Sequence, residues 1–399
     1  MADGTTSIGA RVRAARERNG MLAQDLAAAI GLDPSAMSNI ENDKRSVKAH
    51  ELTAMADALG VSVLALLDEN SLLGRLPTAA RQDDGERVQG SLLDRLRVFA
   101  ELHELLAKGG IGSFARIPED APRVDRTQWR TSANQLACWA TLHLGAVEGP
   151  DHFNNLAERI ETTFYVDVVV EDHSDGTTAG AAITDWTFPL LLVRADQRRP
   201  RGLFTLAHEL GHLLARDHDT FTVDDDLAAH DDRERFANAF AAAYLMPADK
   251  VQAEVEVHGI GPVAIRNLTR TLGVSYQSLI YRLHNLGLID FARRNELEQL
   301  GPRGLLAEFS DPEHARAALS SVADERTSLE HRRPLWLAYR AMQGFKRGVI
   351  SVAPVAELLG ADADHLLDQL TATDSDSVAA LDPNLVTEDD SARYAGRPA

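Results

Sequence analysis

The sequence predicts a multidomain protein with an all-α bundle at the N-terminus, an α+β region in the middle and a mostly helical C-terminal region. Three patterns carry this prediction: short helical stretches between tight turns near the N-terminus, aliphatic runs typical of strands in the centre, and apolar residues at helical spacing after residue 300. The expected divisions are a bundle at 1–70, a linker with one helix at 71–125, the α+β region at 126–299, the helical region at 300–370 and a disordered acidic tail at 371–399.

The composition is that of a globular protein, with 399 residues of which 44% are hydrophobic and 25% are charged. No apolar run reaches the ~18 residues of a membrane span, and the N-terminus lacks the apolar core of a signal peptide. We therefore expect a cytoplasmic protein that does not bind membranes. The net charge of −19 argues against a protein that coats DNA but not against one small DNA-reading module. The single cysteine, Cys138, excludes an internal disulfide and lies in an apolar helical stretch, where we expect a buried thiol.

Residues 7–69 form the pattern of a helix-turn-helix bundle, with short helices separated by tight turns. Gly31 ends the second helical stretch, and Asp33 and Pro34 open the third. The segment resembles the Cro/cI-type (Xre) helix-turn-helix family at Gln24, Leu26, Ala27, Gly31, Ser38, Ile40, Glu41, Leu59, Gly60 and Val61. The resemblance implies that the second helix crosses the phosphate backbone and that the third lies in the major groove of DNA.

The third helix of this bundle is expected to read base edges with short polar side chains, and its flanks to contact phosphates. The candidate base contacts are Ser35, Ala36, Ser38 and Asn39, and the candidate phosphate contacts are Gln24, Lys44 and Arg45. Seven basic side chains stand against five acidic ones between residues 7 and 50. Because this excess is small, we expect weak binding by a monomer and a homodimer on a two-fold double-stranded DNA operator. The alternative is a helical bundle that binds protein instead of DNA.

The stretch TLAHELGHLLARDHD, residues 205–219, carries two histidines four residues apart. Positions i and i+4 share a face of a helix, so His208 and His212 can bind one metal ion. Glu209 follows the first histidine directly and therefore flanks the metal, where it can act as a general base. Gly211 allows another backbone to pack close to this helix. The sequence thus predicts a zinc site, with manganese as an alternative metal, and the activity of a zinc metalloendopeptidase.

The third protein ligand has two main candidates. His218 stands six residues after His212, as in the pattern HExxHxxGxxH, but the hinge glycine of that pattern is Ala215 here. Glu234 opens the next predicted helix, ERFANAFAAAYLMP, and its carboxylate would complete a His2Glu site. Further alternatives close in sequence are His230, Asp231 and Asp232.

Together, the two motifs resemble the ImmA/IrrE metallopeptidase family. The matching positions are Phe204, Thr205, His208, Glu209, His212, Glu234, Ala237, Asn238, Phe240, Ala241, Leu245, Met246 and Pro247. The resemblance covers residues 126–290 and implies a zincin-like α+β fold, Glu234 as the third metal ligand and Glu209 as the catalytic base. The chain departs from the family at Ala215, where members often have a histidine, and in the acidic stretch 217–232, which we expect to be a solvated loop rather than a lid over the cleft.

These features predict a DNA-binding transcriptional regulator with a zinc-dependent endopeptidase domain. Family precedent implies cleavage of an Xre-type repressor, or of the chain itself within the linker at 77–90, which would switch on stress, phage-response or mobile-element genes. One alternative is a one-component transcription factor whose zincin-like domain senses a ligand without proteolysis, and another is a non-enzymatic adaptor. Glu209 favours catalysis, because a sensor needs no general base. His230 and Tyr244 are the sequence candidates for stabilising the oxyanion.

Overall fold

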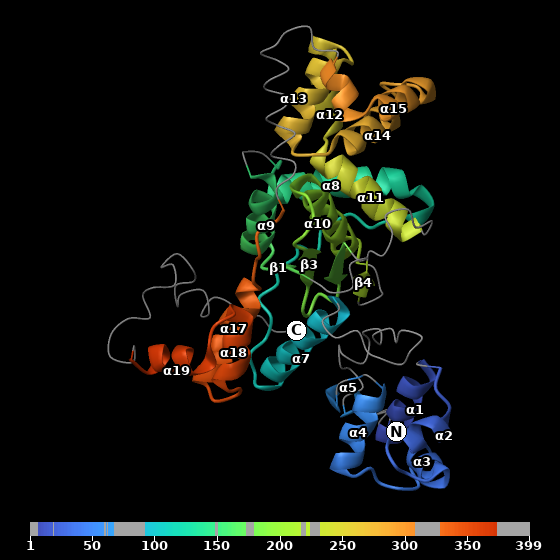
Figure 1. The fold of residues 1–399 in the computed structure, drawn as a ribbon, viewed down its shortest axis with the longest axis vertical. Coiled ribbons are helices and arrows are strands. Elements are labelled where there is room, and N and C mark those ends of the chain that lie inside the picture. The colour runs from blue at the N-terminus through green and yellow to red at the C-terminus, as the bar shows by residue number, and fades with distance from the viewer. Residues whose placement is uncertain are drawn as a thin grey trace.

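The computed structural model describes residues 7–18, 20–59, 61, 63–67, 92–147, 151–172, 179–216, 221–223, 232–307 and 328–372 (Figure 1). Its elements confirm the predicted class: a helical N-terminal unit, a central α+β unit and further helices toward the C-terminus. The linker at 77–90, most of the acidic stretch 217–232 and the tail from residue 373 lie outside the described residues. Within the described part of the chain, no helix combines the length and the apolar character that a membrane span requires.

The N-terminal unit is a bundle of short helices with a core of its own. These helices are α1 (Ile8–Arg18), α2 (Ala23–Ala29), α3 (Pro34–Glu41), α4 (Ala49–Leu59) and α5 (Val63–Leu67). Met37 and Ile40 of α3 are fully buried in this core, as helical spacing requires when the remaining face of α3 is polar. The buried guanidinium of Arg16 on α1 donates to Glu41 on α3 over 2.6 and 3.0 Å. This ion pair joins the first and third helices.

The central unit is built on a four-stranded sheet with the order β1-β3-β2-β4. Strands β1 (Asp167–Glu171) and β3 (Leu190–Arg194) pair in parallel, whereas β2 (Gly180–Ile183) runs antiparallel to both β3 and β4 (Phe221–Val223). Nearly every residue of β1, β2 and β3 is buried. A strand buried on both faces reads as a continuous aliphatic run, which explains the runs VDVVV and LLLV in the sequence.

One face of the sheet lies against a group of four helices, one of which, α10 (Arg199–Leu214), holds the HExxH sequence. The other three are α8 (Trp129–Leu144), α9 (His152–Thr163) and α11 (Asp232–Leu245), and the apolar residues of all four share one core with the sheet. At Gly211 of α10, an added Cβ would lie 2.8 Å from Cδ1 of Phe240 and 3.4 Å from Cα of Ala237. This confirms that Gly211 allows the close approach of a second helix, which is α11.

The chain continues from α11 into four helices: α12 (Ala248–His258), α13 (Pro262–Leu272), α14 (Tyr276–Asn285) and α15 (Phe291–Ala307). In Figure 1 they form the end of the molecule opposite to the N-terminal bundle. Their buried side chains, among them Ile265, Leu279 and Leu283, belong to the same core as α8 to α11. The segment after Met246 is therefore part of the α+β unit rather than a separate module.

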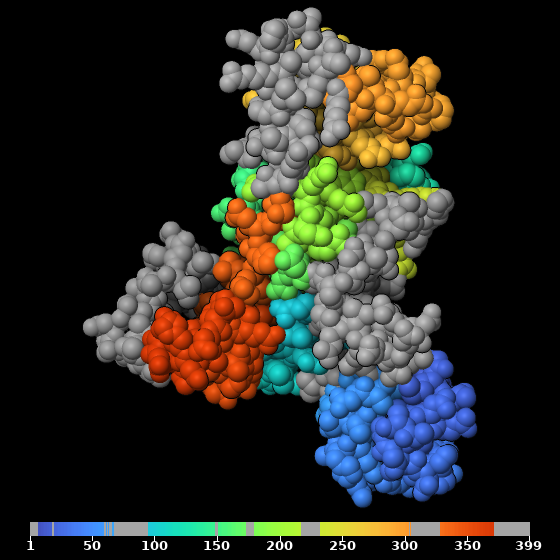
Figure 2. Space-filling view, viewed as in Figure 1, coloured from blue at the N-terminus to red at the C-terminus, as the bar shows by residue number. Residues whose placement is uncertain are grey.

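The other face of the sheet is covered by segments that lie far apart in the sequence. They are α7 (Leu92–Lys108), α17 (Leu335–Lys346), α18 (Val352–Leu359) and α19 (Ala363–Ala372). Helix α7 was predicted to lie in a linker and the last three helices in a separate region, but all four share a core with Val169, Ile183 and Leu192 of the sheet. In Figure 2 the orange and red surface of residues 328–372 adjoins the cyan surface of α7. Helical periodicity identifies an apolar face but not the partner that covers it.

Cys138 is exposed, so the expectation of a buried thiol is wrong. Helix α8 buries Ala133, Leu136, Ala137 and Ala140, which follow one another at helical spacing. Residue 138 is turned by about 100° from residue 137 around the helix axis and falls on the outer face. Because most residues of this stretch are apolar, the sequence does not show which of them face the core.

Candidate metal centre

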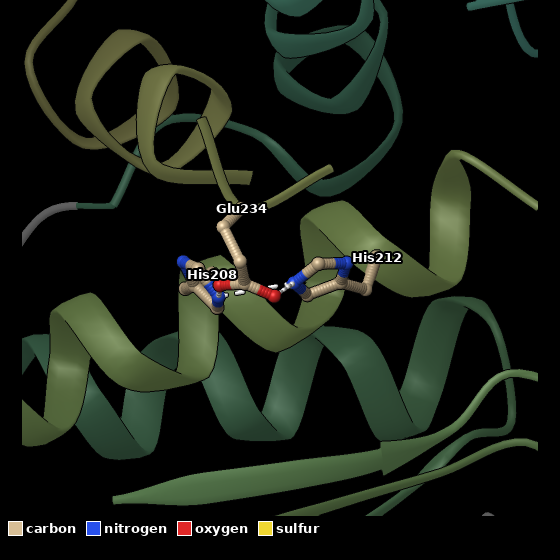
Figure 3. Close-up of side chains that lie close together, drawn as sticks. All are labelled: His208, His212 and Glu234. Atoms are coloured by element: carbon tan, nitrogen blue, oxygen red, sulfur yellow. Dashed lines mark hydrogen bonds and ion pairs between the residues drawn. The ribbon is translucent and has the colours of Figure 1, made fainter. Parts of the chain in front are cut away.

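Three side chains from two packed helices converge in the central unit (Figure 3). His208 and His212 stand one turn apart on α10, and Glu234 lies in the first turn of α11. The Nε2 atoms of the two histidines are 3.0 Å apart. His208 Nε2 lies 3.1 Å from Oε2 of Glu234, and His212 Nε2 lies 3.2 Å from Oε1 of the same carboxylate. The structure thus brings together the three residues that the sequence put forward as metal ligands.

The donor set fits a metal ion in its chemistry and in its spacing. Two imidazole nitrogens and a carboxylate are the ligands of a His2Glu zinc site, in which zinc is held at ~2.0–2.2 Å with tetrahedral geometry. Neighbouring ligand atoms in such a tetrahedron are roughly 3.3 Å apart. The three separations between His208, His212 and Glu234, from 3.0 to 3.2 Å, are close to that value.

The surroundings of this cluster favour a neutral His212 and an ionised Glu234, which are the protonation states that metal binding requires. The side chains of His208 and His212 are 0% and 1% exposed, and that of Glu234 is 16% exposed. Burial lowers the pKa of His212, which favours the neutral imidazole. Burial alone would raise the pKa of Glu234, but hydrogen bonds with His208 and His212 lower it well below its usual range. A metal ion binds neutral imidazoles and an ionised carboxylate, so the cluster is prepared for it.

Asn238 supports the cluster from the next turn of α11. Its Oδ1 lies 3.1 Å from Nδ1 of His208. An amide oxygen only accepts hydrogen bonds, so it would accept from Nδ1–H of a His208 whose Nε2 binds a metal ion, and it would hold the ring in that orientation. Glu234 and Asn238 are four residues apart and share the face of α11 that lies against α10.

Replacing Asn238 by alanine is expected to lower the affinity for zinc by about 10–100-fold, as the loss of a ligand-orienting residue typically does. The ligands themselves stay in place, so the stoichiometry of one zinc ion per chain is retained at saturation. A zinc titration against a competing chelator measures the difference. Asn238→Asp, which keeps an oxygen acceptor, should restore most of the affinity, whereas equal loss in both variants would show that Asn238 does not act through His208.

Among the described residues, neither Asp232 nor Tyr244 joins the cluster. His218, His230 and Asp231 lie outside the described residues. Asp232 is exposed and pairs with Arg235 over 3.3 Å. Tyr244 is buried, and its hydroxyl donates to the carbonyl of Gly145 over 3.1 Å. The expectation that Tyr244 stabilises the oxyanion, which rested on its nearness in sequence, is therefore wrong. Tyr244 stands ten residues beyond Glu234 on α11, roughly 15 Å along the helix axis.

Arg126 is a further residue near the cluster that no sequence pattern suggested, and it opens the short helix η1 (Arg126–Gln128). Its guanidinium carbon lies 5.0 Å from the centre of the Phe236 ring on α11. The positive charge of Arg126 adds to the effects that lower the pKa of His212. No motif marks this arginine, because it lies about 80 residues before the HExxH sequence and is brought to α11 only by the fold.

Most of the candidate DNA contacts are exposed on the N-terminal bundle. Ser35, Ser38 and Asn39 are exposed on α3, Ala36 is half-buried there, and Gln24 is exposed on α2. Lys44 is exposed after α3. Arg45 is half-buried and donates to Glu51 over 2.5 Å, so its charge is already paired within the bundle. Of the two basic candidates for a phosphate contact, Lys44 is therefore the more available.

Comparison with known protein families agrees with this architecture. Residues 7–69 match a helix-turn-helix domain, and residues 164–284 match the IrrE N-terminal-like domain of the M78 peptidases. The chain therefore combines an N-terminal helix-turn-helix domain with a central ImmA/IrrE-type domain. The matched range 164–284 contains His208, His212 and Glu234. No curated protein matches the chain.

Three solved structures of regulators show a distant likeness. A Mycobacterium tuberculosis transcriptional regulator is 18% identical and aligns over 46% of this chain and 51% of its own, with a TM-score of 0.28. ComR from S. thermophilus, in complex with DNA and its signalling peptide ComS, is 15% identical over 80% of this chain and 99% of its own, with a TM-score of 0.20. PlcR from Bacillus thuringiensis, in complex with the peptide PapR7 and DNA, is 11% identical over 92% of this chain and 96% of its own, with a TM-score of 0.16. The chain thus spans about half the length of the Mycobacterium regulator.

Proposed function

We propose that the protein is a DNA-binding transcriptional regulator that carries an active zinc-dependent endopeptidase. The observation that supports this most is the convergence of His208, His212 and Glu234 beside Glu209, inside a domain that matches the M78 peptidases. Zinc is the expected metal, and manganese is the alternative. A bound zinc ion would supply Lewis-acid chemistry, polarising the scissile carbonyl and lowering the pKa of water.

Glu209 is the residue that we assign to proton transfer. It follows His208 directly on α10, is fully buried, and is not one of the three converging ligands. From this position its carboxylate takes a proton from the attacking water and passes it to the leaving amine. Within the described residues, only three potential protein ligands converge. Three protein ligands are typical of catalytic zinc sites, because structural sites are usually closed by a fourth.

The N-terminal domain supports the regulatory half of the proposal. Its α3 exposes Ser35, Ser38 and Asn39, whose short polar side chains suit hydrogen bonds to base edges in the major groove. We propose that two copies of the chain bind a double-stranded operator through these helices. The endopeptidase then cleaves an Xre-type repressor, or the chain itself, and so switches on stress, phage-response or mobile-element genes.

The decisive experiment replaces Glu209 by glutamine, which keeps the shape of the side chain and removes the base. Wild type and E209Q are incubated with zinc or manganese and with Xre-type repressors from the same locus, and cleavage is followed by mass spectrometry. We expect cleavage by E209Q to be slower by about 10²–10⁴-fold, which is the usual contribution of a general base. Metal content and operator binding should stay at the wild-type level.

Two results would contradict the proposal. Cleavage by E209Q at the wild-type rate would show that a contaminant or another residue acts as the base. No cleavage by wild type, together with operator binding that a small molecule alters, would assign the chain to ligand-sensing transcription factors without proteolysis.

A further inference from the structure

The carboxylate of Glu209 lies directly above a glycine of the sheet. Gly180 is the first residue of β2 and is buried beneath α10. A Cβ added at Gly180 would lie 3.0 Å from Oε1 and 3.2 Å from Cγ of Glu209. The same Cβ would lie 2.5 Å from Cγ2 of Thr205, one turn earlier on α10. Any side chain at position 180 would therefore occupy the space that Glu209 and Thr205 share.

A buried hydrogen-bonded bridge fixes the height of α10 above this point of the sheet. Thr205, which is 0% exposed, donates through Oγ1 to Oε1 of Gln197 over 3.0 Å. The amide nitrogen of Gln197 donates to the carbonyl of Ala179 over 2.6 Å. Ala179 immediately precedes Gly180, so the bridge joins the helix that carries Glu209 to the strand on which Glu209 rests. Because the bridge is buried, α10 cannot move away from β2 without breaking a hydrogen bond that water does not replace.

Gly180 serves to leave space, not to supply an unusual backbone conformation. It is absent from the glycines with a positive φ, such as Gly145 and Gly273. Alanine can therefore adopt the backbone conformation of residue 180 without strain. A glycine inside a strand often marks a close approach by other groups, and here those groups are the side chains of Thr205 and Glu209.

We propose that Gly180, held under α10 by the Gln197–Thr205 bridge, is the positioning residue for the catalytic base. The bare Cα of Gly180 defines how deep the carboxylate of Glu209 sits and hence how it faces the water that it deprotonates. This assignment rests on the proposed peptidase function. None of the three atoms nearest to a Cβ at Gly180 belongs to His208, His212 or Glu234, so we expect a side chain there to disturb the base more than the metal ligands.

Gly180→Ala is the direct test. Since the added methyl group must displace Glu209 or Thr205, we expect kcat to fall by about 10–100-fold, the loss that a displacement near 1 Å causes. KM and the zinc content of one ion per chain should remain unchanged. Gly112→Ala is the matched control, because no atom lies within 4 Å of a Cβ at that position and its φ is ordinary.

Thr205→Ser supplies the rescue. It removes Cγ2, the atom nearest to the added methyl group, and keeps the hydroxyl that donates to Gln197. The kcat of the double variant G180A/T205S should exceed that of G180A by at least the square root of the factor lost, which is about 3-fold for a 10-fold loss and about 10-fold for a 100-fold loss. A G180A protein that folds, binds zinc and retains kcat within twofold of wild type would overturn the proposal.

A second measurement decides the matter even if the wild type cleaves no substrate that is tried. The metal-free full chain is compared by thermal unfolding in wild-type, E209Q and E209A backgrounds. G180A should lower Tm by about 2–8 °C in the wild-type and E209Q chains, because overpacking is costly whenever the Glu209 side chain is present. In the E209A chain, which lacks Cγ and the carboxylate, this decrease should be at least halved. Equal decreases in all three backgrounds would show that Gly180 does not position Glu209.

Discussion

Replacing Glu234 by alanine is expected to lower the affinity for zinc by about 10²–10³-fold. Glu234 is the ligand of choice for this test, because it lies on α11 and its removal leaves α10 unchanged. Four ligands together supply ~10–16 kcal/mol in structural zinc sites, so one ligand accounts for about a quarter of that free energy. Glu234 also keeps His208 and His212 in place, since its two carboxylate oxygens lie 3.1 and 3.2 Å from their Nε2 atoms. Competition with a chelator of known affinity measures the loss.

The matched comparison for Glu234→Ala is His218→Ala. His218 was the other sequence candidate for the third ligand, and we expect its removal to leave zinc affinity unchanged. Glu234→Gln separates charge from shape, because it keeps the side-chain length and removes the negative charge. If H218A loses zinc and E234A retains it, the assignment of Glu234 as the third ligand is wrong.

Asp167 is expected to make the stability of the central unit fall as pH rises from about 4 to 7. This carboxylate on β1 is 3% exposed and accepts hydrogen bonds from the backbone N–H groups of Trp336 and Leu337, over 2.6 and 3.0 Å, in the first turn of α17. The pKa of Asp167 is raised to about 7, chiefly by burial and also by the charge of Glu161, while the two N–H groups and Arg340 act in the opposite direction. Arg340 lies one turn along α17, is 1% exposed, and donates to His103 over 2.9 Å.

The direction of this pH dependence follows from proton binding. The unfolded chain releases the Asp167 proton near its ordinary pKa of 3.8, whereas the folded chain keeps it until about pH 7. The folded state therefore binds more protons between these values, and the contribution of Asp167 to the free energy of unfolding is complete below pH 4 and lost above pH 7. The steepest decrease is about 1.4 kcal/mol per pH unit, the value for one proton.

Asp167→Asn tests this expectation, because asparagine keeps an oxygen acceptor for the N–H groups and does not ionise. The free energy of unfolding of D167N minus that of wild type should increase between pH 4 and 7 and then stay constant. Urea unfolding at several pH values, followed by tryptophan fluorescence, measures both proteins, and an unchanged m-value shows that they unfold by the same transition. A difference that does not vary with pH would show that Asp167 is ionised throughout this range in the folded chain.

Much of the candidate site could be predicted because its parts are local in sequence. The spacing of His208 and His212 determines that they share a helix face, and Glu209 follows from its place beside the first ligand. Glu234 required more, since chemistry alone left His218 and other acidic residues in competition, and the resemblance of the second helix to a family motif favoured the glutamate. The helix-turn-helix bundle was predictable for a similar reason, because turn residues such as Gly31 and Pro34 mark its boundaries.

The features that could not be predicted depend on contacts between distant segments. Gly180 has no local signal, since the sequence around a glycine at the start of a strand does not show whether another element packs on it. Arg126 and Gln197 likewise gain their partners only in the folded chain. The packing of α7 and α17 on the same face of the sheet joins segments more than 200 residues apart, and periodicity does not reveal which apolar faces meet.

The C-terminal segment also covers an edge of the sheet. Val170 of β1 and Arg332 exchange backbone hydrogen bonds of 2.9 and 3.0 Å, and β1 is an outer strand in the order β1-β3-β2-β4. An uncovered edge strand is a template for pairing with other chains. A protein shortened to end near residue 300 would therefore expose both this edge and the apolar face beneath α17, and would be prone to aggregation. A fragment that carries the central α+β unit should therefore extend to residue 372, the last residue of α19.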